Sequence, residues 1–533
     1  MKKFRSFLII LCLLPVLKLS GQETPVEKGL RSITDDAIKA QLGFLASNWT
    51  EGRMIGERGA SLSADYIVSI LQLCGVKPGG DFASGRVAGS EAAKRERTWF
   101  QNFVLLKTLP GEQELSLRSS EDNLVKTIHF NRNTDFTFRS SENSFESEAP
   151  VIFVGHGYIN NKLKHNDFDK TDAKGKFILK ISGIPTKFKE SLTREEMMSS
   201  NTETETAIRE MGIAGIIEVN PMSITVGNPE RADFENMSPS EGIVRPGRPY
   251  ASYSIAGKRP SDNIIRITVS VKTANEILKG SGFTVEDYLK KEESGETPLK
   301  PLLKGKTIRL KSMATTTQVP VKNIIGIIEG NNPDQVIVLG AHYDHMGMGN
   351  GYIWNGADDN GSGTVGVMTI AKAIIMETGK KPDKTIVVAL WTAEEEGLLG
   401  SRYFVQSQDY PVKDIKLNMN FDMISRYISP GDPKKVTMTY TGSFPSFQDL
   451  TTGNIKKYGI DLVVDYQPSA DPPGGTDHRS FVAAGIPIIR FKPGHREEYH
   501  TPKDELSTVN WDIMKEIIRI NFADVWELAN TSW

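Results

Sequence analysis

The C-terminal half of the chain constrains the fold most, because short apolar runs alternate there with segments of helical pattern. Four of these runs have the length and composition of buried strands: Val336–Leu339, Ile386–Leu390, Leu417–Met423 and Ile486–Phe491. Between the first two lies Gly363–Met376, whose apolar residues recur at helical spacing. Strands alternating with helices predict an α/β fold with a mostly parallel central sheet flanked by helices. In such sheets ligands bind beyond the carboxyl ends of the strands.

Each of the four runs is followed by side chains of the kinds that hold metals. These side chains belong to His342-Tyr343-Asp344-His345, to Asp358-Asp359 in the next loop, to Glu394-Glu395-Glu396, to Asp422 and to Tyr499-His500. Imidazoles and carboxylates together are the ligand set that suits zinc. Asp422 ends a strand that should be buried on both faces, where an unpaired carboxylate is costly. The pattern therefore predicts a metal site at this rim of the sheet.

Charge counting favours a site for two zinc ions. The ions bring four positive charges, and Asp359, Glu395 and Asp422 with a bridging hydroxide bring four negative ones. Neutral His342 and His500 complete the set, one on each metal, with Asp359 between the ions. Paired zinc ions lie about 3.5–4 Å apart and can both polarise a carbonyl and supply hydroxide near neutral pH.

Two further carboxylates have predicted roles beside the metals. Glu394 adjoins the ligand Glu395 and can point to the other side of the metals, so we predict that it is the general base and then the general acid. Asp344 follows His342 by two residues, and its side chain is predicted to accept the other N–H of the imidazole. A loop-capping role for Asp344 explains its position equally well.

Taken in order, the motifs resemble those of the co-catalytic di-zinc aminopeptidases of metallopeptidase family twenty-eight. The resemblance rests on His342-Tyr343-Asp344, Gly356-Ala357-Asp358-Asp359-Asn360-Gly361-Ser362-Gly363, Ala393-Glu394-Glu395-Glu396-Gly397-Leu398-Leu399-Gly400-Ser401, Asn420-Phe421-Asp422-Met423 and Tyr499-His500. It implies the same five ligands and a catalytic Glu394, and its register selects Asp359 rather than Asp358 as the bridging residue. It also implies a cis peptide between Asp359 and Asn360 and an oxyanion-stabilising phenol at Tyr499. The stretch Thr476-Asp477-His478 resembles a recurring Ser-Asp-His stretch in relatives, but we do not expect it to supply a ligand.

The rest of the chain suggests further domains. Helical patterns at Ile38–Ala46 and Leu62–Cys74 resemble the family's N-terminal layer, whereas β-like runs with one helix near Glu203–Met211 resemble an inserted protease-associated domain. We predict an N-terminal helical part of the peptidase domain at 22–124, the inserted β-rich domain at 125–300 and the catalytic zinc peptidase domain at 301–533. A lid, a specificity wall, a docking module and a cap are all open roles for the insertion.

The N-terminus has the layout of a secretory signal peptide at residues 1–21, with basic residues before the apolar run Phe7–Leu17. We therefore expect secretion, with the periplasm favoured over the extracellular space and no stable membrane insertion after cleavage. Cys74 is then the only cysteine of the mature chain, so an internal disulfide is excluded. Lys and Arg number 64 against 66 Asp and Glu, a balance that argues against a nucleic-acid partner.

The leading hypothesis is a secreted zinc-dependent aminopeptidase that removes N-terminal residues from peptides through a di-zinc-bound hydroxide with Glu394 as base. A glutamate carboxypeptidase-like exopeptidase and a non-catalytic peptide-binding protein are the alternatives. A single-zinc glutaminyl cyclase is disfavoured, because such relatives lack the first histidine ligand, here His342. Side-chain preference, native metal and oligomeric state stay open.

Overall fold

The computed structural model describes residues 23–82, 96–121, 124–132, 134–138, 143–189, 191–221, 251–257, 264–296, 303–349, 351–407 and 409–533. The predicted signal peptide at 1–21 lies outside the described residues. Within these ranges, none of the helices combines the length and the apolar character needed to cross a bilayer.

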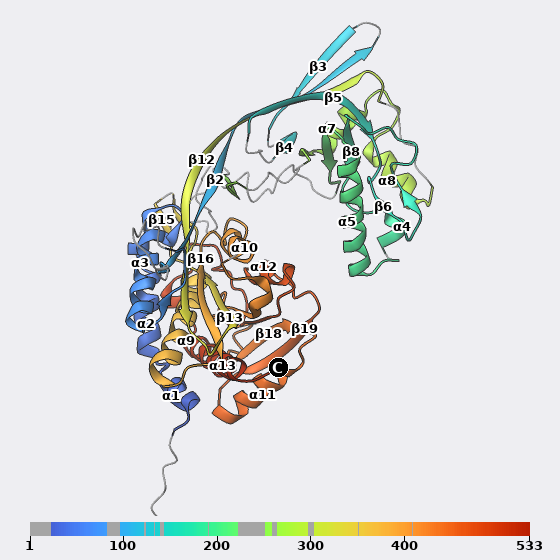
Figure 1. The fold of residues 1–533 in the computed structure, drawn as a ribbon. Helices are drawn as coiled ribbons and strands as arrows, with labels where there is room; N and C mark the ends of the chain where they lie inside the picture. The colour runs from blue at the N-terminus through green and yellow to red at the C-terminus, as the bar shows by residue number, and fades with distance from the viewer. Residues whose placement is uncertain are drawn as a thin grey trace, which may run out of the picture.

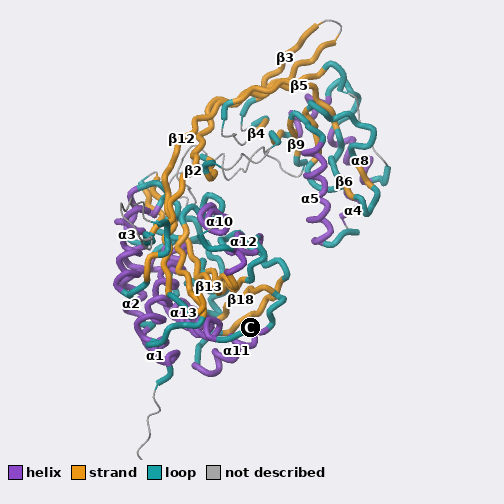
Figure 2. Tube along the Cα trace, in the orientation of Figure 1, coloured by secondary structure: helices purple, strands orange, loops and turns teal. Residues whose placement is uncertain are grey.

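The chain folds into two lobes that are joined by an arm of two long strands (Figures 1 and 2). β2 (Phe100–Glu121) and β12 (Lys306–Ile328) pair antiparallel from Lys306↔Ser119 to Ile324↔Phe100. One end of β12 pairs with β16 (Lys384–Trp391) in the first lobe, and its other end pairs with β5 (Phe145–Phe153) in the second. Hydrogen-bonded strands thus run without a break from one lobe into the other.

The first lobe is built on a mixed sheet in the order β19-β18-β20-β17-β13-β16-β12. Its remaining strands are β13 (Asn332–His342), β17 (Ile415–Asn420), β18 (Lys435–Thr441), β19 (Val463–Ser469) and β20 (Ile488–Lys492). The central strands β16, β13, β17 and β20 are parallel, and all four coincide with runs predicted to be strands. All residues of β16 are buried, as expected of a strand covered on both faces. The predicted α/β fold is therefore confirmed.

Helices cover both faces of this sheet. One face packs against α1 (Pro25–Ser32), α2 (Asp35–Leu45), α3 (Arg58–Leu73), α9 (Gly363–Lys372), α11 (Ser446–Tyr458) and α13 (Trp511–Asn530). The other face packs against α10 (Leu399–Gln406) and α12 (His478–Ala483). Side chains of β13 alternate between the two cores, with Ile337 and Leu339 on the first side and Val336 and Val338 on the second. The segment predicted as one helix, Gly363–Met376, continues past α9 as a wider turn, η4 (Ala373–Glu377).

The second lobe also contains a sheet covered by helices. Its strands follow the order β12-β5-β8-β9-β11-β4, with β8 (Phe177–Ile181), β9 (Gly215–Val219), β11 (Arg266–Val269) and β4 (Phe136–Phe138). Its helices are α4 (Thr186–Lys189), α5 (Arg194–Glu210), α7 (Val271–Leu278) and α8 (Val285–Glu293). Smaller strands are β3 (Leu124–Phe130), β6 (Ile159–Asn160) and β7 (His165–Asn166), and β10 (Ser252–Ile255) pairs with β2 in the arm.

The hydrophobic core of the second lobe extends beyond the segment 125–300. Besides Phe136, Phe177 and Ile267, it includes Leu115 and Leu117 of β2 and Ile308 and Leu310 of β12. The packed unit thus begins before residue 125 and ends after residue 300, because the arm strands supply part of its interior. The identity of this lobe as a protease-associated domain stays a prediction.

A buried carboxyl group between α11 and α13 yields a pH-dependent test of this packing. Asp524 accepts hydrogen bonds from Thr451 Oγ1 at 2.7 Å and Asn454 Nδ2 at 2.9 Å, and burial raises its pKa from 3.8 to about 7. Because the folded-state pKa is the higher one, ionisation disfavours folding: the penalty is absent below about pH 4 and complete above about pH 7. Asp524→Asn should therefore raise stability at pH 8 by up to about 4 kcal/mol and leave it almost unchanged at pH 4.

Thermal unfolding at the two pH values measures this difference. Asp465→Asn, at an exposed position of β19, is the matched control and should show no gain that depends on pH. An equal change at both pH values for Asp524→Asn would mean that ionisation of this group does not oppose folding.

Candidate metal centre

The carboxyl ends of the parallel strands bring the predicted site residues together. His342 is the last residue of β13, Glu394 and Glu395 follow β16, and Asp422 follows β17. Asp359 lies in the turn η3 (Ala357–Ser362) that leads into α9. His500 stands in the loop after β20. Since His342 pairs in register with Trp391, and Gly340 with Asn420, these strands end at nearly the same level.

His342 faces a first group of carboxylates. Its Nε2 lies 3.3 Å from Asp359 Oδ1, 3.7 Å from Asp422 Oδ1 and 3.9 Å from Glu394 Oε2. His342 is 1% exposed. This corner of the site therefore offers one buried imidazole nitrogen and several carboxylate oxygens.

His500 faces a second group. Its Nε2 lies 3.1 Å from Asp359 Oδ2 and 3.2 Å from Glu395 Oε2. Asp359 thus directs one oxygen toward His342 and the other toward His500. A carboxylate that bridges two cations would have this arrangement.

The residues fit a pair of divalent cations. Two triads, His342 with Glu394 and Asp422, and His345 with Asp359 and Glu395, each offer ligand atoms within 4.8 Å of one another. Asp422 Oδ1 is buried, and no hydrogen bond to it occurs within the part of the chain that the structure describes. Nitrogen and oxygen ligands of this kind suit zinc, and a cation would satisfy that oxygen.

Electrostatics of the site show an excess of buried negative charge. Burial raises the pKa of Asp344 to about 6 and raises the pKa of Glu394 well above its ordinary value. Burial lowers the pKa of His500, but the nearby Glu395 and Asp359 outweigh this effect and raise it to about 10. The carboxylates therefore favour added positive charge, which metal ions would supply.

The peptide between Asp359 and Asn360 is cis, as the family resemblance implied. The two adjacent aspartates face different surroundings. The Asp358 carboxylate accepts from the Ser425 N–H at 2.9 Å and from the Ser425 hydroxyl at 2.7 Å, whereas the Asp359 carboxylate faces the histidines. This contrast agrees with the choice of Asp359 as the bridging candidate.

Asp344 contacts His342 through a different atom from the one predicted. Nδ1 of His342 donates to the main-chain carbonyl of Asp344 at 3.2 Å, while the carboxylate Oδ1 lies farther away, at 3.8 Å. That same Oδ1 accepts the backbone N–H of Glu394 at 3.2 Å. The side chain therefore holds the loop after β16, and the main chain orients the imidazole.

Tyr499 stacks on the imidazole of His500, with ring centroids 3.7 Å apart and planes inclined by 24°. It is 39% exposed, so its ring forms part of the outer wall of the site. Asp477 and His478, which were not expected to be ligands, are buried near the site but belong to neither triad.

His345 belongs to the site, although the sequence analysis assigned it no specific role. Its Nδ1 lies 2.7 Å from Glu395 Oε1, and its ring centroid lies 6.0 Å from that of His500. Glu395 thus contacts His345 through one oxygen and His500 through the other. The signal was present, since His345 ends the motif that begins at His342, but a spacing pattern could not distinguish a ligand from its support.

Arg53, in the N-terminal part of the chain, is a second residue that sequence reasoning missed. Its fully buried guanidinium donates to the main-chain carbonyls of Leu45, Tyr343, Asn355, Gly356 and Asp359, at 2.6–3.4 Å. These carbonyls belong to α2, to the loop after β13 and to the loop that carries Asp359. A single cation therefore holds together three segments around the site.

Asp504 fixes the same loop from the other side. Its two carboxylate oxygens accept the backbone N–H groups of Asp358 and Asp359, both at 2.9 Å, and it forms a buried ion pair with Arg426. Residues with a left-handed backbone also cluster here: Arg53, Ala393, Met423 and His500 have φ between 52° and 58°. Such backbone is costly for residues other than glycine and persists where the surrounding contacts impose it.

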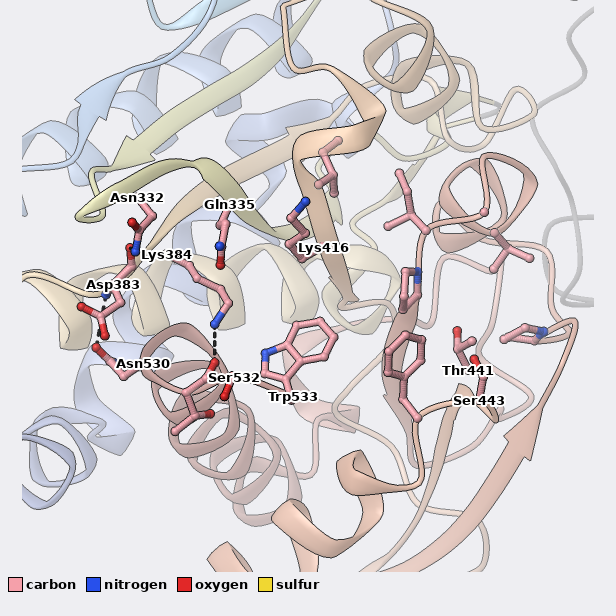
Figure 3. A pocket seen from close by; sticks show the side chains of 18 of the residues that line it. Asn332, Gln335, Asp383, Lys384, Lys416, Thr441, Ser443, Asn530, Ser532 and Trp533 are labelled. Atoms are coloured by element: carbon pink, nitrogen blue, oxygen red, sulfur yellow. Dashed lines mark hydrogen bonds between the residues drawn. The ribbon is translucent and has the colours of Figure 1, made fainter.

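A separate cavity of about 740 Å³ opens at the opposite end of the sheet (Figure 3). Its lining includes Asn332, Lys384 and Ile415, the first residues of β13, β16 and β17. Lys384 Nζ donates there to the carbonyl of Leu528 at 2.9 Å and to that of Thr531. This cavity is therefore distinct from the cluster of ligand atoms, and its lysine serves to close the end of α13.

Comparison with known proteins gives three findings. Residues 323–524 match the model of Peptidase family M28. The probable leucine aminopeptidase 2 of Trichophyton verrucosum and the leucine aminopeptidase 2 of Trichophyton rubrum are each 36% identical to the chain over 171 residues, which is 31% of this chain and 32% of either relative. The chain thus spans about a third of the length of these curated relatives. The aminopeptidase from Aneurinibacillus sp. strain AM-1 has a TM-score of 0.53 at 17% identity and covers 95% of this chain and 97% of its own, a likeness of fold alone.

The contacts of Arg53 lead to a stability prediction. Arg53→Met keeps an apolar stem but leaves several buried carbonyls without a donor, at about 1–3 kcal/mol each when no water replaces it. We expect a loss of at least about 3 kcal/mol in the free energy of unfolding, measured by urea denaturation. Arg58→Met is the matched control: Arg58 pairs with Glu51 at an exposed position and should cost less than about 1 kcal/mol. Equal effects of the two substitutions would contradict the role assigned to Arg53.

Proposed function

Residues 323–524 match the model of Peptidase family M28, and from this match we propose that the chain is a zinc-dependent aminopeptidase that removes N-terminal residues from peptides. The observation that carries the proposal is the position of Asp359 between His342 and His500, which suits two neighbouring metal ions. The leucine aminopeptidase relatives support the reaction class.

The proposed ligands divide between two zinc ions. His342 and Asp422 would hold one ion, His500 and Glu395 would hold the other, and Asp359 would offer one oxygen to each. Zinc ions bound there would polarise the scissile carbonyl and lower the pKa of a water molecule. His345 contacts one oxygen of Glu395, which would leave the other oxygen for the cation.

Glu394 is the proposed general base. Its backbone N–H is held by Asp344, and its carboxylate approaches the His342 side of the site without belonging to the five ligands. From there Glu394 takes a proton from the attacking water and returns it to the leaving amine. Tyr499, at the outer wall beside His500, is the proposed donor to the oxyanion that develops on the substrate.

An aminopeptidase and a glutamate carboxypeptidase-like exopeptidase differ in the end of the peptide that they require. Hydrolysis of a free dipeptide, with loss of activity on its N-acetylated form, would support the aminopeptidase. Secretion through residues 1–21 to the periplasm completes the proposal, and N-terminal sequencing of the exported protein tests it.

The role of Glu394 is tested by Glu394→Gln, which preserves size and removes the base. We expect zinc content near that of the wild type and a fall in kcat of about 10²–10⁴-fold. Glu396→Gln changes a neighbouring glutamate outside the proposed machinery and should keep most of the activity. Normal turnover in Glu394→Gln would show that another group moves the proton.

Metal stoichiometry tests the bridge separately from activity. Asp359→Asn removes charge that both ions share, so bound zinc should fall from two ions per chain to less than one. Asp422→Asn alters only one of the two sites and should leave about one ion. Metal analysis after dialysis against a metal-free buffer measures both numbers, and an equal loss from the two variants would contradict the bridging position of Asp359.

A further inference from the structure

Beside the proposed zinc ligands, β20 carries two basic residues on one face. Arg490 and Lys492 are two positions apart, so both lie on the same face of β20 as Ile488. On this face Ile488 belongs to the core that also contains residues of α10 and α12. Arg490 is 9% exposed, although it carries a full charge. Its guanidinium lies close under the loop before α12: a Cβ on Gly474 would come within 2.4 Å of Arg490 Nη1.

The Arg490 guanidinium makes no hydrogen bond and no ion pair with any residue that the structure describes. The other two buried arginines of the site behave differently, since Arg53 donates to five carbonyls and Arg426 pairs with Asp504. Burying a guanidinium without partners is costly, and the chain bears this cost only at Arg490 among these three. This exception points to a partner that comes from outside the chain.

Arg490 and Lys492 stand next to the Asp422 side of the proposed zinc site. Arg490 pairs in register with Asn420, two residues before Asp422, and Lys492 Nζ lies 3.7 Å from the sulfur of Met423. Burial lowers the pKa of Arg490 and the charge of Asp422 opposes this effect, which also reflects their proximity. Asp422 cannot serve as the missing partner, because its carboxylate is engaged as a proposed ligand.

We propose that Arg490, with Lys492 beside it, binds a carboxylate of the substrate and so selects short or acidic peptides. The proposal rests on the aminopeptidase function proposed above. A guanidinium matches a carboxylate with two parallel hydrogen bonds, a geometry that a neutral amide cannot reproduce. The carboxylate comes either from the C-terminus of a dipeptide or from an acidic side chain next to the cleaved bond.

Wild-type protein loaded with zinc gives the first test, which depends on no variant. The kcat/KM values are compared for Leu-Leu, Leu-Leu-amide, Leu-Glu-amide and Leu-Gln-amide. A preference for Leu-Leu over its amide identifies the C-terminal carboxylate, and a preference for Leu-Glu-amide over Leu-Gln-amide identifies the side chain. We expect at least one preference of about 10- to 100-fold, as for a charge-assisted hydrogen bond.

The second test assigns that preference to Arg490. The quantity compared is kcat/KM for the preferred carboxylate substrate divided by kcat/KM for its amide counterpart. In Arg490→Met this ratio should fall by about 10- to 100-fold, mainly through KM, and Arg490→Lys should restore part of it. Arg309→Met is the matched control, because Arg309 lies on β12 in the second lobe and pairs with the exposed Glu146. Zinc content and thermal unfolding are measured for each variant to confirm that it is folded.

The outcomes separate the two proposals. Absence of hydrolysis of all four substrates by zinc-loaded wild type would overturn the aminopeptidase function itself. Hydrolysis without any preference for a carboxylate would overturn only the present inference. A preference that Arg490→Met retains would also overturn it, since another residue would then hold the carboxylate.

Discussion

The structure around the site depends on how Asp359 is held, because its two oxygens must face two different histidines. The backbone of the turn that carries it departs from helical geometry at Asp359 and Asn360. Asp504 instead accepts the N–H groups of Asp358 and Asp359, while Arg53 takes the carbonyls of Asn355, Gly356 and Asp359. The amide groups of the turn are thus satisfied by a negative charge, and its carbonyl groups by a positive one. Both charges come from parts of the chain that are distant in sequence. The bridging position is therefore a property of the whole first lobe rather than of a local motif.

Crowding of negative charge at the ends of the strands is the second constraint. His342, Asp359, Glu394, Glu395 and Asp422 meet within a region from which bulk water is largely excluded. In such a medium like charges repel strongly, so the arrangement is stable only with compensating cations. The chain itself provides two buried cations close by, Arg53 and Arg426. Arg53 and Arg426 act on the backbone and on the supporting carboxylates, whereas the direct ligand atoms are left to face one another, as a metal site requires.

The sequence allowed the sheet and the strand ends to be predicted because both leave a pattern within a few residues. Apolar runs marked β13, β16, β17 and β20, and the polar residues directly after them lie at one rim. Supporting contacts left no such pattern. Arg53 acts through main-chain carbonyls about 300 positions away, and Asp504 acts through main-chain amides.

The helices α7 and α8 were also missed, although Ser270 and Thr284 cap their first turns. Their short apolar faces resemble strand runs when the N-caps are not considered.

The arm explains how a large insertion can leave the metal centre intact. β2 and β12 pair along nearly their whole length, so the chain leaves the first lobe and returns to it through adjacent strands, with Leu109 opposite Thr315. The insertion therefore lies at the far end of this antiparallel strand pair, and the near end of the pair belongs to the sheet of the first lobe. The ladder contains an irregularity between Ser312 and Ala314, next to the segment Thr307–Ser312 in which β12 pairs with β5 as well as with β2. Bulges of this kind bend and twist a strand pair, so this position accounts for the change of direction between the lobes in Figure 1. Since β12 also pairs with β16, whose end leads to Glu394 and Glu395, one strand connects the second lobe to the base of the site.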